Sequence, residues 1–362
     1  MSRFGDGSIS HFLSADQRRD GASGPGALGG SGLCAVMWIA RGWLWSAWNG
    51  WYASPACLFA QPGCRMDLRK PALWSCIAGT SLRHLAVGSA LLSAIFANSA
   101  GADEAGELVS QINEFRASGE GCGGAKAEQV GPLAPAAALA SIPAGAGAQL
   151  QQAVRESGYQ AASLQAMAVT GPGDASTVMR VFRQRYCSAL LSEDFAEIGV
   201  SREGDTWQVI LAKPLLSADL GDWQQAGKAV LEQVNRARAE PRRCGSQRFG
   251  AAPPLTWNQR LGETALAHSQ DMAKRDYFSH QGHDQSLAGD RASRQGYRWQ
   301  RIGENIAAGH GSAEQAVSGW LASPGHCQNV MNPDFTEMGA AYATNPQSAA
   351  TIYWTQVFGT PR

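Results

Sequence analysis

The feature that most constrains this chain is an internal repeat. Two blocks occur twice with identical spacing: an Asn followed nine residues later by a Cys, and a Cys-x6-Asp-Phe-x-Glu-x-Gly run, found at Asn113/Cys122, Cys187–Gly199, Asn235/Cys244 and Cys327–Gly339. Chance does not reproduce this many spacings around both cysteines. The sequence therefore predicts a tandem duplication, with a boundary within residues 214–225.

The repeat also predicts how the cysteines of this region pair. Each copy holds one early and one late cysteine. Four cysteines allow three connectivities, and the duplication favours one loop closed in each copy. We therefore expect the bridges Cys122–Cys187 and Cys244–Cys327, each contributing roughly 2–5 kcal/mol of stability.

The residues upstream of the repeat have the pattern of an exported protein. Residues 1–65 are rich in Trp and lack any period, and we interpret them as a non-native extension ahead of Met66; a membrane-associating leader is the alternative. Residues 66–102 combine basic residues, the 13-residue apolar run Leu85–Ala97 and an A-x-A site. This pattern predicts a signal peptide cleaved near Ala102, with an uncleaved anchor as the alternative, because the run is too short to span a bilayer.

Charge and cysteine content agree with a secreted or periplasmic protein. The whole chain has 30 Lys and Arg against 30 Asp and Glu. That balance argues against nucleic acid as a partner, because such proteins carry a basic excess. An even number of cysteines beyond residue 102 favours disulfides in an oxidising compartment. We expect no transmembrane segment in the mature chain.

The two copies differ where chemistry would occur. All five histidines beyond residue 102 lie in the second copy, at positions 268, 280, 283, 310 and 326. When the copies are aligned, Ala166 stands opposite Glu304, Met167 opposite Asn305 and Tyr186 opposite His326. We therefore predict a degenerate domain over 103–215 with a structural or partner-binding role, a linker over 216–225 and an intact domain over 226–362.

The second copy has helical patterns early and strand patterns late. Asn258 is expected to cap a helix that carries Leu261, Ala265 and His268 on one stripe. Ser312 opens a second helix, which we expect to stop at residues 323–325. Residues 337–343 and 350–358 read as a hairpin. This order predicts an α+β fold with helices packed on a small antiparallel sheet.

A run of motifs in the second copy resembles a known family. The motifs occur in the order Tyr277–His280, Gly303–Ala307, Trp320–Met331 and Tyr353–Gly359. Together they are similar to a bacterial member of the CAP superfamily, also called SCP-like, which includes cysteine-rich secretory and pathogenesis-related proteins. The resemblance implies an α-β-α sandwich, secretion, and a cleft of His and acidic residues that can hold a divalent cation.

The resemblance also indicates the residues of the cleft. Carried over onto this sequence, they are His280, Glu304 and His326, with Asn305 and Arg291 in support. Relatives from animals and plants add a second Glu and a His at the start of the last strand, which this chain lacks. Two imidazoles and one carboxylate would leave a fourth position for water on Zn²⁺, with Ca²⁺ and Mg²⁺ as alternatives. The other interpretation is a polar cluster that shapes the cleft without metal.

The remaining polar residues have structural interpretations. His268 lies on an apolar stripe and reads as a core histidine. His283 and His310 lie among glycines and are expected to be exposed, with a place at the rim of the cleft as the alternative for His283. The pair Asp290-Arg291 is interpreted as a structural ion pair or a helix cap. Asn329 and Asn332 are expected to cap a turn.

Three functions remain open on these grounds. The leading one is a non-enzymatic binding module, whose cleft takes a small apolar ligand, a cation, or a component of an envelope or host surface. The second is a metal-dependent, peptidase-like hydrolase using His280, Glu304 and His326. The third is an adhesion or scaffold protein, in which neither histidine matters.

Overall fold

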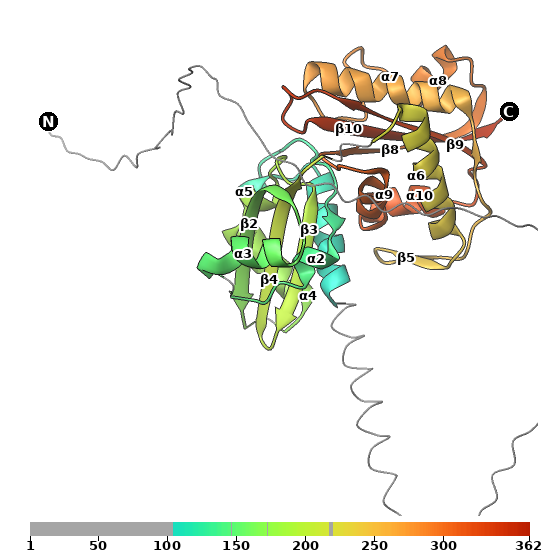
Figure 1. Cartoon of the computed structure of the whole chain (residues 1–362). Coiled ribbons are helices and arrows are strands. Elements are labelled where there is room, and N and C mark those ends of the chain that lie inside the picture. Colours follow the sequence, from blue (N-terminus) through green and yellow to red (C-terminus); the bar gives the residue numbers. More distant parts are fainter. Residues whose placement is uncertain (1–103, 146, 172, 217–219) are drawn as a thin grey trace, which may run out of the picture. The chain divides into compact units, whose positions relative to one another are not determined.

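Two four-stranded sheets with the same strand order organise the chain. The computed structural model describes residues 104–362 apart from 146, 172 and 217–219 (Figure 1). The sheet orders are β1-β3-β4-β2 and β7-β9-β10-β8. In each, a two-residue outer strand runs parallel to its neighbour and the other strands pair antiparallel. The predicted extension over 1–65, the signal peptide over 66–102 and its cleavage near Ala102 lie outside the described residues.

The first sheet carries helices on both faces. Its strands are β1 (Ala134–Pro135), β2 (Ala161–Thr170), β3 (Glu197–Glu203) and β4 (Thr206–Pro214). The other elements are a helix over 104–117, η1 (Cys122–Gly124), α2 (Ala137–Ala140), η2 (Gly147–Gln149), α3 (Leu150–Glu156), α4 (Ala175–Arg185) and α5 (Cys187–Leu190). Side chains alternate between the faces of a strand. Accordingly, Val209 and Leu211 pack with α4, and Ile210 packs with α2 and α3.

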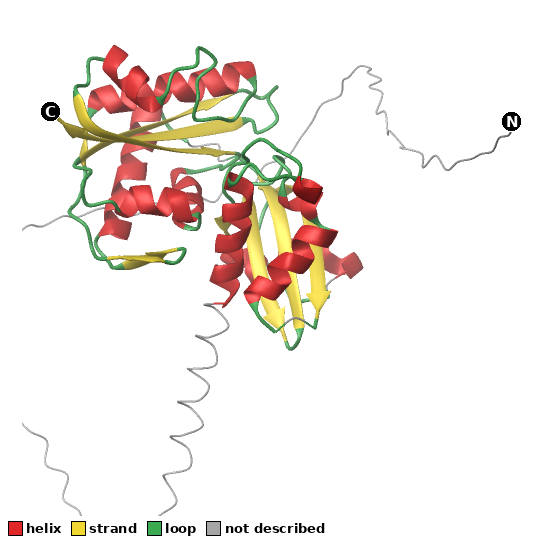
Figure 2. Ribbon diagram, turned by 180° about the vertical axis from the view of Figure 1, so that it is seen from behind, coloured by secondary structure: helices red, strands yellow, loops and turns green. Residues whose placement is uncertain are grey.

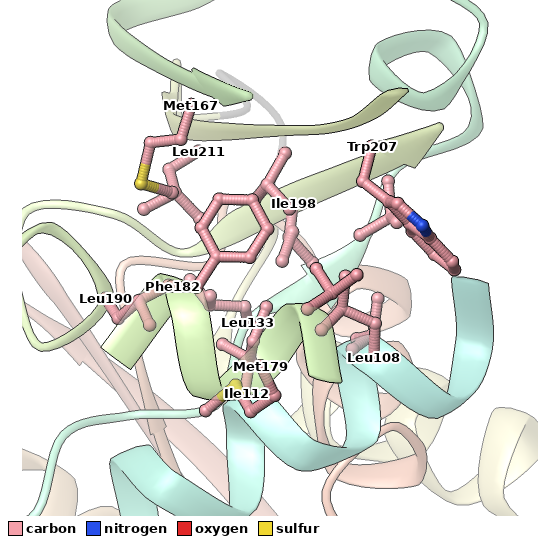
Figure 3. Close-up of a cluster of buried hydrophobic side chains, with 14 of the residues drawn as sticks. Leu108, Ile112, Leu133, Met167, Met179, Phe182, Leu190, Ile198, Trp207 and Leu211 are labelled. Carbon is pink, nitrogen blue, oxygen red and sulfur yellow. The ribbon is translucent and has the colours of Figure 1, made fainter. Parts of the chain in front are cut away.

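The larger core of the first half packs between α4, the helix over 104–117 and the sheet. Phe182 of α4 points at Leu211 and Met167 of the sheet (Figure 3). Leu108 and Ile112 come from the helix over 104–117 and complete the cluster. All the described side chains of this cluster lie within the first half, apart from a contact with Ala322.

The second sheet lies between two helical layers (Figure 2). Its strands are β7 (Thr256–Trp257), β8 (Trp299–Ala308), β9 (Glu337–Thr344) and β10 (Ile352–Pro361), and a small hairpin is formed by β5 (Arg242–Cys244) and β6 (Gln247–Phe249). The helices are α6 (Trp223–Arg238), α7 (Gln259–Arg275), α8 (Ala288–Arg294), α9 (Ala313–Leu321) and α10 (Pro324–Met331). On β10, Trp354 and Phe358 pack with α6, α9 and α10, and Val357 packs with α7. This is the expected α-β-α sandwich.

A buried arginine makes the same hydrogen bonds in each half. Arg116 donates to the backbone oxygens of Gly131, Leu190, Ser192 and Phe195. Arg238 donates to the equivalent oxygens of Pro253, Val330, Asn332 and Phe335. Both side chains are buried. A guanidinium has five donors in a rigid fork, so it can tie several loop carbonyls together where water is excluded.

Most predicted element boundaries are confirmed. Asn258 accepts hydrogen bonds from the first turn of α7, and Ser312 accepts one from the backbone of Gln315 in α9. The terminal hairpin is β9 and β10. The expected stop is confirmed, because α9 ends at Leu321, and Pro324 then begins a further helix, α10. Proline is favoured at the first helical position, where no N–H is required.

Both predicted disulfides are present. Cys122 is bonded to Cys187, and Cys244 is bonded to Cys327. The bridges close loops of 65 and 83 residues, one in each half. They link the segment after the first helix of each half to the segment before β3 or β9.

The halves differ most in the first helix after β1 or β7. In the first half this helix is α2, with four residues, and in the second half it is α7, with 17 residues. Only the second half therefore has the long helix and the following loop, residues 276–287, that carry most of its histidines. Over residues 104–362, apart from the five omitted positions, no helix is both long and apolar enough to cross a membrane.

Candidate functional site

Three elements of the second half bring the predicted cleft residues together. His280 lies in the loop between α7 and α8, Glu304 on β8 and His326 on α10. They line one cavity of about 560 Å³. Glu304 is opposite Val357 of β10 in the sheet, so its backbone is held in a central part of the ladder.

His280 and Glu304 form a direct hydrogen bond. His280 Nδ1 lies 2.9 Å from Glu304 Oε1. The carboxylate accepts, so Nδ1 carries the proton and Nε2 is the ring nitrogen left for other partners. The side chain of His280 is 40% exposed and that of Glu304 only 4%. The buried carboxylate therefore orients a histidine that solvent can reach.

Arg291 occupies the other oxygen of Glu304. Its Nη2 lies 2.6 Å from Glu304 Oε2, and the guanidinium also donates to the backbone oxygens of Ser286 and His280. Burial opposes ionisation of Glu304. The hydrogen bond from His280 and the nearby charges of His268 and Arg291 outweigh it and hold the pKa of Glu304 below its usual value.

His326 faces His280 across the cavity. The two ring centroids are 6.4 Å apart. His326 Nδ1 lies 2.9 Å from Ser323 Oγ, so its Nε2 is also left for other partners. Burial, reinforced by the proximity of His280, lowers the pKa of His326 to about 3. The ring is therefore neutral at physiological pH.

Two of the five predicted residues support the cleft from behind. Asn305 is fully buried and donates to the backbone oxygen of His326, which holds α10 against β8. Arg291 is also buried and lines a different cavity. Neither residue lines the cleft that contains His280, Glu304 and His326.

Sequence reasoning missed the role of Asn329. Its Nδ2 donates to the backbone oxygen of Glu304 and to Asn305 Oδ1, and it lines the cleft. The sequence predicts only a turn cap for this residue. The missed signal was spacing, because Asn329 lies three residues after His326 and therefore on the same face of α10.

The prediction that His310 is exposed is wrong. His310 is fully buried, and its Nε2 lies 3.0 Å from the backbone oxygen of Pro132. Gly309, just before His310, has φ of +81°, in the left-handed region that glycine adopts readily. Burial lowers the pKa of His310 to about 4. His283 is exposed and His268 is buried, as expected.

Asp290 and Arg291 do not act as a pair. Asp290 Oδ2 accepts from the backbone N–H of Leu287 and so caps α8. Arg291 binds Glu304 instead. Asp290 is therefore a helix cap, which is one of the two interpretations given above, and the ion-pair partner of Arg291 is Glu304 on β8.

The first half contributes one wall of the cleft. Described residues 104–362 fall within a single compact unit. The lining from the first half consists of Glu114, Ala117, Ser118, Gln129 and Val130. Asn113 Nδ2 donates to the backbone oxygen of Ala322, which lies just ahead of Ser323. The cleft is therefore built from both halves of the chain.

The geometry does not fit a three-ligand metal site. A catalytic zinc site uses three protein ligands and a water. Each oxygen of Glu304 already accepts a hydrogen bond, from His280 or from Arg291, and the side chain is only 4% exposed, so the accessible ligands are the two imidazole nitrogens. Within the described part of the chain, no group of three or more His, Cys, Asp or Glu is arranged to hold a metal ion.

Comparison with known proteins identifies the second half. Residues 231–358 match the model of the CAP family, described as the cysteine-rich secretory protein family. The C-terminal part of this chain is therefore a CAP domain. The resemblance noted from the motifs is confirmed for these residues.

Two curated relatives come from Bacillus subtilis (strain 168). Uncharacterized protein YkwD is 36% identical over 131 residues, which are 36% of this chain and 46% of the relative. Uncharacterized membrane protein YlbC is 39% identical over 85 residues, 24% of this chain and 25% of the relative. The match thus spans less than half the length of either relative.

Two solved structures show limited similarity to this chain. One is an extracellular protein with an SCP domain from Bacillus anthracis str. Ames, 26% identical, with a TM-score of 0.32 over 43% of this chain and 52% of that one. Another is a cysteine-rich secretory protein from Staphylococcus aureus subsp. aureus Mu50, 13% identical, with a TM-score of 0.29 over 42% and 51%.

Proposed function

We propose that this protein is exported and that its CAP domain is a binding module, with the His280/Glu304/His326 cleft as the ligand site. One observation carries the proposal: both oxygens of Glu304 are engaged, one by His280 and one by Arg291. A carboxylate held in this way fixes the geometry of a binding surface. Export is supported by the two disulfides, which persist in oxidising compartments.

The same observation disfavours the hydrolase. That reading needs Glu304 as a metal ligand or a general base. A general base must reach the substrate proton and is usually tuned toward neutral pKa. Glu304 is 4% exposed, and its pKa is lowered. An inaccessible carboxylate with a lowered pKa is a poor general base, so these two properties of Glu304 favour binding over catalysis.

The lining of the cleft favours a ligand with an apolar body and one polar end. Phe278, Ile306 and Val130 supply apolar surface, and His280 and His326 supply ring nitrogens. The cavity of about 560 Å³ falls within the range of about 300–1,000 Å³ for small-molecule sites. A single-chain lipid has this chemistry.

A fluorescent fatty acid tests this function. Saturable binding by the protein should weaken by roughly tenfold or more in Phe278→Ala and in His280→Ala, corresponding to about 1.4 kcal/mol. The control is His283→Ala, because His283 is exposed and does not line the cleft. Absence of saturable binding, or equal binding by all three variants, would rule out the apolar-ligand version.

Cation binding by the two imidazoles is a second candidate. Each has its Nδ1 engaged, and the ring centroids are 6.4 Å apart. Imidazole favours Zn²⁺ over Ca²⁺ and Mg²⁺, which prefer oxygen ligands. Two protein ligands would give weak binding, and Glu304 would act only by orienting His280. The third reading, adhesion or scaffolding, differs in requiring neither histidine.

We also propose that residues 103–215 are a degenerate copy of the CAP skeleton. The identical strand order supports this, as do the equivalent hydrogen bonds of Arg116 and Arg238. On this reading the first copy lost the long helix that α7 forms in the second. Its role is then to form a wall of the cleft rather than a site of its own.

A further inference from the structure

The two disulfides differ in how far solvent can reach them. Cys244 and Cys327 are 1% and 0% exposed. Cys122, in contrast, is exposed, and its partner Cys187 is only partly buried. A reductant must bring a thiolate into contact with one of the two bonded sulfurs. The bridge of the first half is therefore open to attack in the folded protein, whereas the bridge of the second half is shielded.

Cys122 lies in a loop, residues 119–129, that has little packing of its own. We call this segment the wall loop. All eight residues over 122–129 are exposed. Backbone hydrogen bonds donated by Gly121 and Ala127 fold the wall loop back on itself. A segment without buried side chains gains little from packing, so its position depends on the links that tie it to the rest of the fold.

The disulfide ties the wall loop to a well-packed part of the first half. Cys187 begins α5, whose Ala189 and Leu190 are buried. A second link is the ion pair between Glu120 and Arg183, whose side chains are 47% and 39% exposed. Exposed ion pairs contribute little to stability. The covalent bridge is therefore the stronger of these two links.

The wall loop forms part of the first half's contribution to the cleft. Gln129, within the loop, and Ser118 and Val130, on either side of it, line the cavity that contains His280 and His326. Gln129 Nε2 also donates to the backbone oxygen of a further lining residue of the first half. A change in the position of the wall loop would therefore displace polar groups on one side of the cleft.

We propose that the Cys122–Cys187 bridge is a redox switch in the wall of the cleft: a dithiol reductant opens it selectively and loosens the wall loop, while Cys244–Cys327 stays closed. One thiolate of the dithiol attacks Cys122 Sγ and displaces Cys187 as a thiolate. The second thiol of the reductant then attacks the mixed disulfide. Two electrons and two protons thus pass to the two cysteines, and the reductant becomes a disulfide. The effect on ligand binding rests on the function proposed for the cleft.

Limited reduction with dithiothreitol, followed by alkylation and peptide mass spectrometry, tests the selectivity. In the folded protein we expect Cys122 and Cys187 to be alkylated roughly tenfold faster or more than Cys244 and Cys327, because an accessible sulfur reacts without unfolding. In urea the two pairs should react at similar rates, which separates accessibility from intrinsic reactivity. Equal rates in the folded protein, or faster labelling of the second pair, would overturn the proposal.

Hydrogen exchange at the amides of Gly121 and Ala127, followed by nuclear magnetic resonance, reports on the wall loop. Reduction of the parent, and Cys122→Ser/Cys187→Ser without reductant, should each speed this exchange roughly tenfold or more. The matched control is Glu120→Gln, which removes the exposed ion pair but keeps the bridge, and should change the exchange by less than about twofold. Should the double variant fail to fold, the reduced parent gives the same measurement. Unchanged exchange after reduction would show that the bridge does not hold the loop.

Binding of the fluorescent fatty acid tests the link to the cleft. The affinity of the parent should fall severalfold on reduction, and that of Cys122→Ser/Cys187→Ser should not respond to dithiothreitol. A parent that binds equally well before and after reduction would contradict the switch. A parent that binds no fatty acid in either state would count against the proposed function alone, because alkylation and exchange still decide whether the bridge opens and loosens the wall loop.

Discussion

Arg291 supports Glu304 from a buried position, with Arg291 Nη2 2.6 Å from Glu304 Oε2 and side-chain exposures of 7% and 4%. Glu304 Oε1 in turn orients His280. The exposed histidine of the cleft is thus the end of a chain of contacts that begins on α8. Its orientation depends on a residue that never reaches the cleft.

Removal of Arg291 should strongly destabilise the protein. Arg291→Met leaves the Glu304 carboxylate buried without its ion-pair partner, which typically costs about 3–5 kcal/mol. The control is Arg301→Met, whose pairing with Asp334 is 58% and 52% exposed and is worth about 1 kcal/mol or less. Urea denaturation of both variants measures the difference. Equal losses would show that the buried pair contributes no more than the exposed one.

Stability should fall as the pH drops below about 6.5. The folded-state pKa of His310 is lowered to about 4 from an ordinary value of 6.5. The unfolded chain therefore takes up a proton across this window while the folded chain does not, which opposes folding. Complete titration of this one group corresponds to about 3 kcal/mol.

A variant isolates the contribution of His310. His310→Gln retains a side-chain N–H for the backbone oxygen of Pro132 but cannot titrate. Its free energy of unfolding should be flatter between pH 6.5 and 4 than that of the parent. His283→Gln is the control, because His283 is exposed. An identical pH slope in parent and His310→Gln would contradict the assignment.

Each disulfide should stabilise the half that contains it. The variants Cys122→Ala/Cys187→Ala and Cys244→Ala/Cys327→Ala should each lose roughly 2–5 kcal/mol, because an open loop gains freedom in the unfolded chain. Calorimetry in the absence of reductant measures the loss. A variant with unchanged stability would mean that its bridge does not constrain the unfolded chain.

Two equivalent glycines should be intolerant of a methyl group. A Cβ on Gly199 would lie 2.4 Å from the carbonyl carbon of Leu139, and one on Gly339 would lie 2.0 Å from the backbone nitrogen of Gly262. In both cases strand and helix backbones meet. Gly199→Ala and Gly339→Ala should each cost about 3 kcal/mol or more, by overpacking.

Gly250→Ala is the reference variant for this pair, because a Cβ on Gly250 meets nothing within 4 Å. Near-zero loss at Gly199 together with a large loss at Gly339 would argue that the first half lacks the close strand–helix packing of the second. That outcome would weaken the proposal of two copies of one skeleton. Thermal unfolding of the three variants decides between these outcomes.

The sequence was sufficient for features that depend on spacing. The disulfides followed from the repeated cysteine positions, and the caps at Asn258 and Ser312 followed from local side-chain chemistry. The two strand-like runs over 337–343 and 350–358 predicted the terminal hairpin. These features involve short segments or repeated patterns, which a single sequence displays directly.

The environment of the site could not be derived in this way. Nothing near Arg291 in the sequence indicates that its guanidinium reaches across to Glu304 on β8. His310 lies between two glycines, a pattern typical of exposed loops, but packing against Pro132 from the other half buries it. Both outcomes depend on contacts between distant segments, which only the folded chain defines.

The most direct test of the central claim is a calorimetric titration of Zn²⁺ into the metal-free protein, beside His280→Ala/His326→Ala and Glu304→Gln. The account predicts that any Zn²⁺ binding is weak, is lost in the double histidine variant, and survives in weakened form in Glu304→Gln, because Glu304 orients His280 without ligating the metal. One-site Zn²⁺ binding that is abolished by Glu304→Gln would contradict it. That result would mean that Glu304 leaves Arg291 to ligate a metal, and it would restore the hydrolase as the leading function.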